Sequence, residues 1–354
     1  MTICLTMIVK NESDVIRRCL ESVLPIIDSW VIIDTGSTDN TKEIILDVLK
    51  GIPGKLESKE WVDFSHNRNE AIALAQEMAD YMLFIDADEV ISFPENYDFS
   101  SLTNAIYCST VHLDTIRYAR ISLASTEYDW KYEGVLHEFL SCGVDHKLIP
   151  LDGFITHCST DGARSKNPNK YREDAEVLKA ALIKEPTNDR YAFYLAQSYR
   201  DAGMHDDAIE AYKVRGKMNV WKEEEWFCSY QIARLSHITG KPYAEVISAY
   251  FTAHQKRPSR IESMFWLGAY FINLEQYSNA VVVLESIQSS EYSKDILFIE
   301  HDIYNWLRID SLALAYSYSG KTTEAKELWK SLSLNPNLPS AELARIRNNI
   351  TYCG

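Results

Sequence analysis

The sequence predicts an α/β domain with a mostly parallel sheet, followed by an all-α domain made of helical repeats. Over the first 90 residues, short apolar runs alternate with segments of helical spacing. From about residue 187, small and aromatic residues recur in the pattern of helix-pair repeats. The two parts also differ in net charge. Residues 1–165 contain 13 Lys and Arg but 27 Asp and Glu (net −14), whereas residues 166–354 contain 23 and 24 (net −1). We therefore expect two domains, 1–165 and 166–354.

The first domain alternates strands and helices along the chain. Apolar runs predict strands at 3–9, 30–34, 55–62 and 81–85. Helical spacing predicts helices between them, at about 15–24, 44–49 and 67–79, with Pro25 ending the first. After residue 90 the segments 107–112, 116–123, 128–136 and 154–157 are strand-like and have no helices between them. This order is typical of a sheet with helices on its faces.

The second domain shows an internal repeat. Its small residues fall at Ala196, Ala233, Gly268 and Ala313, at steps of 37, 35 and 45 residues, close to the tetratricopeptide period with insertions. Residues 170–186 predict a single helix that precedes the array. Such arrays have concave surfaces that often bind peptides, although they also serve as scaffolds or dimerisation modules.

The composition excludes several classes of protein. The 354 residues carry 36 Lys and Arg against 51 Asp and Glu, a net charge of −15, which argues against binding to nucleic acid or to an anionic membrane. The seven cysteines include no C-x-x-C pair, so neither a disulfide framework nor a zinc site is indicated. We see no signal peptide and no 18-residue apolar run. A cytoplasmic protein without membrane insertion is the expectation.

The sharpest local feature is Asp86-Ala87-Asp88, directly after an apolar strand. In parallel sheets, ligands bind beyond the carboxyl ends of the strands, where Asp34 also falls. Carboxylate oxygens are preferred ligands of Mg²⁺ and Mn²⁺, which share their coordination with substrate phosphates. The alternative is a pair of solvated loop carboxylates, since a lone D-x-D is common.

Several motifs together resemble a known family. In order, MIVKNES, CLESVLP, WVIIDTGSTDNT, FSHNRNEAI and YMLFIDADE are similar to the nucleotide-sugar-binding half of GT-A-fold, family 2 glycosyltransferases, over residues 3–90. YEGVLHEFL and ITHCSTDG, followed by the repeats, resemble a bacterial subgroup with tetratricopeptide extensions, which includes peptide S-glycosyltransferases. The resemblance implies an α/β GT-A (Rossmann-like) nucleotide-sugar domain followed by a tetratricopeptide-like domain.

The resemblance also implies roles for individual residues. Nucleotide-sugar binding is expected of the backbone around Met7 and Val9, and of Asn11, Glu12, Asp34, Arg68, Asn69 and Asp86. Asp88 and His157 match metal ligands, and His137-Glu138 lies where inverting relatives place a general base. Each role has a structural alternative: Arg68 could pair with Glu70 or Asp63, and His157 could be a core histidine. Thr35 replaces a second acid of many relatives, and the E-D dipeptide that many use as base is missing.

The implied function is an inverting, metal-dependent glycosyltransferase. It would use Mg²⁺ or Mn²⁺ and a UDP-sugar, with glucose or N-acetylglucosamine as the expected sugar. The repeats would present a peptide or protein acceptor. Two alternatives stay open: a transferase for a glycan or lipid-linked acceptor, with the repeats forming a homodimer, and an inactive scaffold protein.

Overall fold

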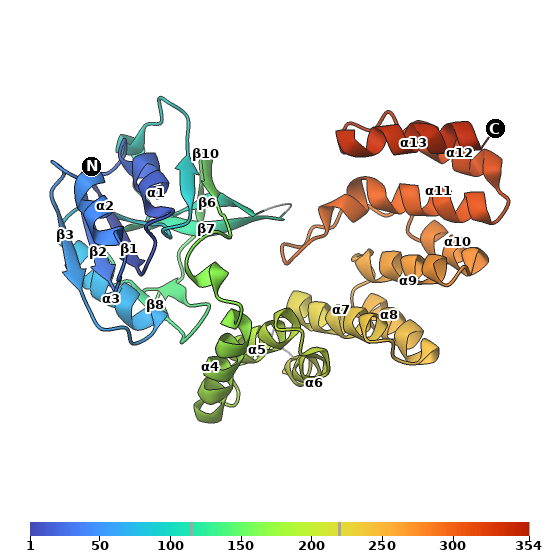
Figure 1. Ribbon diagram of the computed structural model, residues 1–354, viewed down its shortest axis with the longest axis horizontal. Coiled ribbons are helices and arrows are strands. Elements are labelled where there is room, and N and C mark those ends of the chain that lie inside the picture. The colour runs from blue at the N-terminus through green and yellow to red at the C-terminus, as the bar shows by residue number, and fades with distance from the viewer. Residues whose placement is uncertain (114–115, 219–220, 354) are drawn as a thin grey trace. The chain divides into compact units, whose positions relative to one another are not determined.

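The chain forms two compact units in a computed structural model that describes residues 1–113, 116–218 and 221–353 (Figure 1). The units comprise residues 1–184 and 185–354. An α/β unit followed by an all-α unit confirms the predicted fold class. The boundary falls after Lys184 rather than after residue 165, because α4 (Lys170–Lys184) groups with the α/β unit. Asp174 of this helix accepts a hydrogen bond from Arg164, which ties α4 to the segment before it.

The α/β unit is built on an eight-stranded mixed sheet with the order β3-β2-β1-β4-β7-β6-β10-β5. Its parallel part contains β3 (Gly54–Ser58), β2 (Ser29–Asp34), β1 (Ile3–Val9) and β4 (Tyr81–Phe84). Beyond β4 lie β7 (Ile116–Ser125), β6 (Ile106–Leu113), β10 (Ile149–His157) and β5 (Val90–Ser92). The register pairs Val9 with Asp34, so these strands end at the same edge.

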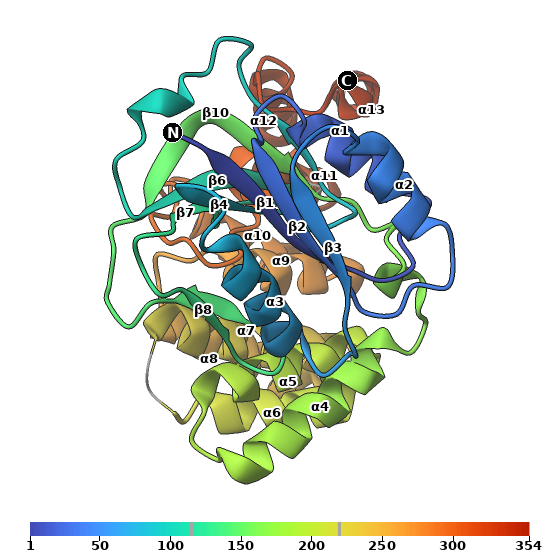
Figure 2. The ribbon, with the colours of Figure 1, turned by 90° about the vertical axis from the view of Figure 1, so that its left-hand side faces the viewer.

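Helices cover both faces of the parallel strands (Figure 2). On one face, side chains from alternate positions of β1, such as Leu5 and Met7, pack with α1 (Ile16–Val23), and α2 (Thr41–Val48) joins the same core. On the other face, Cys4 and Val31 pack with α3 (Phe64–Ala75). The two-residue period of a strand therefore supplies both cores.

Most predicted elements of this unit are confirmed, with shifted ends. The third helix begins at Phe64, three residues before the expected start, because the Asp63 side chain accepts a hydrogen bond from the backbone N–H of His66 and caps it. The expected strand at 128–136 is reduced to β8 (Lys131–Glu133), which pairs with β9 (Phe139–Ser141) in a separate two-stranded sheet. The three-residue strands β5 and β9 were not predicted.

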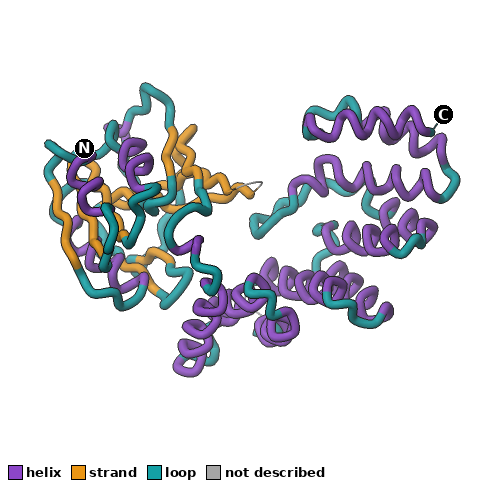
Figure 3. The backbone as a smooth tube through the Cα atoms, viewed as in Figure 1, coloured by secondary structure: helices purple, strands orange, loops and turns teal. Residues whose placement is uncertain are grey.

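The second unit is all helical in its described residues (Figure 3). Its pairs are α5 (Asp189–Asp201) with α6 (His205–Arg215), α7 (Lys222–Ile238) with α8 (Tyr243–Lys256), α9 (Glu262–Asn273) with α10 (Tyr277–Glu285), and α11 (Arg308–Tyr318) with α12 (Thr322–Leu332). A π-helical turn (Ile303–Leu307) precedes α11, and α13 (Ser340–Tyr352) follows α12. Each predicted small residue is buried, and a Cβ on Gly268 would lie 2.6 Å from Cγ of Leu284. Small residues therefore permit the close approach of paired helices.

Across the described residues, no helix combines the length and the apolar character needed to cross a lipid bilayer.

Candidate functional site

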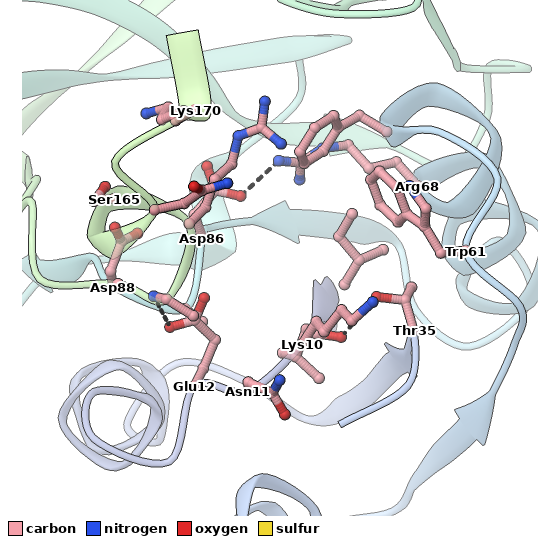
Figure 4. A pocket seen from close by; sticks show the side chains of 18 residues that line it. Lys10, Asn11, Glu12, Thr35, Trp61, Arg68, Asp86, Asp88, Ser165 and Lys170 are labelled. Carbon is pink, nitrogen blue, oxygen red and sulfur yellow. Dashed lines mark hydrogen bonds and ion pairs between the residues drawn. The ribbon is translucent and has the colours of Figure 1, made fainter. Parts of the chain in front are cut away.

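A cavity of about 550 Å³ lies at the carboxyl ends of β1 and β4 (Figure 4). Three regions supply most of its lining. The turn after β1 contributes Lys10, Asn11 and Glu12, the turn after β4 contributes Asp86 to Asp88, and the segment after β10 contributes Gly162 to Ser165 with Asn167 and Lys170. Trp61 and Phe64 add an aromatic wall, with ring centroids 4.8 Å apart in an edge-to-face pair. Its volume and mixed lining suit a small polar ligand with an aromatic part.

Asp88 presents a carboxylate to the cavity, and no ion pair of Asp88 occurs within the described residues. Burial, followed by the charges of Asp86 and Glu89, raises the pKa of Asp88 to about 6. Gly162 packs directly against it, since a Cβ at position 162 would lie 2.6 Å from Oδ2 of Asp88. The carboxylate is thus held among negative charges, where a cation would be stabilised.

Glu12 is a second carboxylate on the same side of the cavity (Figure 4). Its Oε2 accepts a hydrogen bond of 3.1 Å from the backbone N–H of Ala163. Burial is the main cause that raises the pKa of Glu12 to about 7, and the charge of Asp88 adds to it. The preceding Asn11 has a positive φ of 56° and accepts a hydrogen bond from Thr38 N–H at 2.8 Å. Asn tolerates this conformation better than most residues.

Arg68 joins two carboxylates at the cavity wall. Its Nη2 lies 2.6 Å from Oδ1 of Asp86, and its Nε lies 2.7 Å from Oε1 of Glu138. Although burial alone would raise the pKa of Asp86, the pair with Arg68 holds it below its ordinary value. Neither partner that the sequence suggested for Arg68, Glu70 or Asp63, is used. The guanidinium lines the cavity, but two carboxylates largely compensate its charge.

Three residues expected at the nucleotide lie beside the cavity without lining it. Asp34 is buried and accepts hydrogen bonds from the backbone N–H groups of Gly36 and Ser37, each 3.0 Å long. Asn69 uses its amide on Tyr132, donating to the carbonyl at 3.0 Å and accepting from the N–H at 2.7 Å. Met7 is a buried core side chain, whereas Val9 lines the cavity. In the described structure the side chains of Asp34, Asn69 and Met7 therefore contact other parts of the fold and do not line the cavity.

The expected base and the late histidine also lie outside the lining. Glu138 reaches the cavity only through Arg68, and its neighbour His137 is exposed with a positive φ of 54°. His157 ends β10, where its Nε2 is 2.8 Å from Oγ of Ser92 and its ring contacts His112. Ser159 and Gly162, rather than His157, contact Asp88. The structure therefore brings together Val9, Asn11, Glu12, Arg68, Asp86 and Asp88, but not the two histidines.

Sequence reasoning missed the aromatic wall and the cations after β10. Arg164 lies over the ring of Phe64, with Cζ 4.6 Å from the centroid, and also pairs with Asp174. Lys170 is the first residue of α4. The sequence feature that could have predicted these cations is the run of Arg164, Lys166 and Lys170, which follows a strongly acidic stretch of the chain.

The donor set fits a divalent cation only in part. Within the described residues, no group of three or more His, Cys, Asp or Glu side chains is arranged to hold a metal ion. Two carboxylates on one cavity wall, Glu12 and Asp88, nevertheless suit Mg²⁺, which commonly takes one or two protein carboxylates and completes its shell with substrate phosphates and water. The site fits a cation that arrives with a phosphate-bearing ligand.

Comparisons with known proteins give matches within both units. Residues 4–95 match the model of Glycosyl transferase family 2, and residues 191–214 match a Tetratricopeptide repeat. A TPR repeat-containing protein of Synechococcus elongatus is 41% identical over 158 residues, which cover 42% of this chain and 37% of the relative. The SPbeta prophage-derived glycosyltransferase SunS of Bacillus subtilis is 27% identical over 233 residues, covering 60% of this chain and 52% of SunS. The chain thus spans about half or less of each relative.

Among solved structures, S. aureus TarS 1–349 in complex with UDP-GlcNAc is similar, with a TM-score of 0.40 and 13% identity over 72% of this chain and 91% of that one. The matched residues 4–95 contain β1 to β4 and the Asp86-Ala87-Asp88 turn. Residues 4–95 therefore belong to glycosyl transferase family 2, and the helical unit that follows carries a tetratricopeptide repeat.

Proposed function

We propose that this protein is an inverting glycosyltransferase that moves a sugar from a UDP-sugar to a peptide or protein side chain. The observation that carries the proposal is the cavity of the family 2 domain, where two carboxylates face an aromatic wall and several cations. Glucose and N-acetylglucosamine are the proposed sugars of this donor.

The leaving group of the reaction would be UDP. As the bond between the sugar C1 and the β-phosphate oxygen breaks, negative charge grows on the diphosphate. Arg164 and Lys170 supply positive charge at the lining, and Trp61 offers an aromatic face to the base. Attack by the acceptor on the opposite face of C1 inverts the anomeric configuration.

A divalent cation, Mg²⁺ or Mn²⁺, would be held by Asp88 together with the donor phosphates. When bound, it would neutralise the charge of the departing diphosphate. His157 is the further ligand that the family resemblance implies, but it lies outside the cavity lining, so it would have to move to share a cation with Asp88.

The acceptor needs a base if its nucleophile is a hydroxyl. Glu138 can serve once its hydrogen bond with Arg68 is released, with His137 beside it. A cysteine thiol needs less help, because part of it is thiolate near neutral pH. The helical unit is the proposed acceptor-binding module, because arrays of such repeats have concave surfaces that bind peptides. The protein is expected to work in the cytoplasm.

The first test is binding and hydrolysis of UDP-sugars by the Asp88→Asn variant. We expect UDP affinity in the presence of Mn²⁺ to fall at least tenfold and donor hydrolysis to fall further, because Asn retains the shape but loses the charge. Calorimetric titration gives the affinity, and release of UDP gives the rate. Asp47→Asn removes an exposed carboxylate from α2 and is the matched control. Full activity of Asp88→Asn in protein treated with EDTA would refute the metal role, and no binding of any nucleotide by the wild type would favour a scaffold.

A further inference from the structure

The cavity is completed by a segment that other parts of the chain hold in place. Residues 159–167 follow β10 and supply Gly162, Ala163, Arg164, Ser165 and Asn167 to the lining. Three side chains from the turn after β1 and from α1 contact this segment. Glu12 accepts from Ala163 N–H at 3.1 Å, Asp14 pairs with Lys166 at 2.7 Å, and Arg18 pairs with Asp161 at 2.5 Å.

Arg18 makes the most extensive of these contacts. Its Nη1 and Nη2 donate to the two carboxylate oxygens of Asp161 at 2.8 and 2.5 Å, a bidentate arrangement. Nη2 also donates to Oγ of Ser159 at 2.8 Å and to the backbone carbonyl of Asp88 at 3.3 Å. Ser159 donates to the same carbonyl at 2.7 Å. One guanidinium therefore joins the 159–167 segment to the backbone of the acid in the cavity.

Arg18 makes these contacts although its side chain is partly exposed. The side chain of Arg18 is 41% exposed and does not line the cavity, and single surface ion pairs contribute little to stability. Its contacts, however, converge on two elements that lie 70 and 143 positions away in the sequence. Gly162, next to Asp161, packs against the Asp88 carboxylate, so a shift of the segment would change the surroundings of that carboxylate.

We propose that Arg18 is a positioning residue for donor binding, which fixes Asp88 and the 159–167 segment relative to each other. The inference rests on the proposed function, because it takes the cavity as the site of the donor diphosphate. Arg18 would not contact the donor. Its loss would let the segment open and would leave Asp88 free to move from the geometry that binds the diphosphate.

The experiment compares Arg18→Gln with Arg17→Gln in the full chain. Arg17 is the neighbouring residue of α1, with a side chain 50% exposed that pairs with Asp47 at 2.7 Å, so its replacement removes an equivalent charge and ion pair away from the segment. Two quantities are measured: amide hydrogen exchange of residues 159–167 without ligand, and the affinity for UDP with Mn²⁺. We expect exchange at Ala163 and Ser165 to become about tenfold faster, and the dissociation constant to rise about five- to tenfold, in Arg18→Gln only.

Two further variants make the result decisive. Asp161→Asn breaks the same pair from the other side and should reproduce both effects if Arg18→Gln folds poorly. Arg18→Lys keeps the charge but loses the bidentate contact, and should recover part of the affinity. Equal exchange in Arg18→Gln and Arg17→Gln would overturn the proposal, and so would faster exchange with unchanged UDP affinity. Failure of the wild type to bind UDP would instead refute the proposed function, and with it any link between Arg18 and a donor.

Discussion

Glu12 places a partly buried carboxylate near Asp88. Burial and then the charge of Asp88 raise its pKa from 4.5 to about 7. The folded protein therefore holds this proton more tightly than the unfolded chain does. Stability is lost as pH rises from about 4.5 to about 7, and the penalty is complete above that window.

Replacing Glu12 by Gln should consequently stabilise the metal-free protein at high pH. Gln keeps an acceptor for Ala163 N–H and removes the charge, so we expect a gain of about 1–2 kcal/mol at pH 8, after allowance for solvent screening, and a smaller gain at pH 5. Thermal unfolding at both pH values gives the result, with Glu95→Gln in an exposed loop as control. Equal gains at pH 5 and pH 8 would contradict the raised pKa.

At the residue scale, the sequence identified the acids better than it identified their partners. Asp86 and Asp88 follow directly from a strand that ends at the ligand-binding edge. The partners of Arg68, Asp86 and Glu138, could not be predicted, because they lie 18 and 70 positions away and their proximity depends on the fold. The sequence did not predict that Trp61 and Phe64 line the cavity, since aromatic residues more often pack in a core than contact a ligand. Arg18 has no local signal in the sequence, because its contacts with the site are with residues 70, 141 and 143 positions away.

At the scale of elements, Asn69 fastens α3 to β8. Its amide makes two hydrogen bonds with the backbone of Tyr132, at 3.0 and 2.7 Å. Asn69→Ala would leave a part-buried N–H and carbonyl without these partners, so we expect the free energy of unfolding to fall by about 2–3 kcal/mol. Urea denaturation measures the loss.

The control for Asn69→Ala is Asn279→Ala, since Asn279 is an exposed residue of α10 with one side-chain hydrogen bond to Gln276. It should cost well under 1 kcal/mol, as most surface substitutions do. A loss of UDP affinity in Asn69→Ala without a loss of stability would return Asn69 to the nucleotide-binding role that the family resemblance implies.

Elements with long, regular patterns could be predicted from the sequence, and short ones could not. The strands β1, β2 and β4 are apolar runs because both of their faces are buried, and α5 to α12 repeat a pattern of helix contacts. In contrast, β5 and β9 have three residues each, too few for a periodic signal. The strand order β7-β6-β10-β5 could not be predicted from the sequence either, because β5 pairs with β10, whose residues come about 60 positions later.

At the scale of the whole molecule, the acidity of the first domain is compatible with a diphosphate ligand. The net charge of −14 over residues 1–165 is spread over a large surface and screened by salt, whereas Arg164 and Lys170 act at the cavity itself. Both residues belong to the connection between the sheet and the repeats. The end of the first unit therefore affects the proposed donor site as well as the fold.

The location of this end leads to a prediction about two fragments. A fragment of residues 1–184 retains α4 and every residue that lines the cavity, whereas a fragment of residues 1–165 lacks Asn167, Lys170 and Asp174. Asp174 is the carboxylate partner of Arg164, so the shorter fragment also releases a side chain of the lining. We expect the 1–184 fragment to bind UDP with Mn²⁺ with an affinity within about threefold of that of the full chain. The 1–165 fragment should bind at least tenfold more weakly than the 1–184 fragment, a difference of about 1.4 kcal/mol or more in binding free energy. Calorimetric titration of both fragments measures this, with circular dichroism to verify that each is folded. Equal affinities would mean that α4 has no part in the proposed donor site.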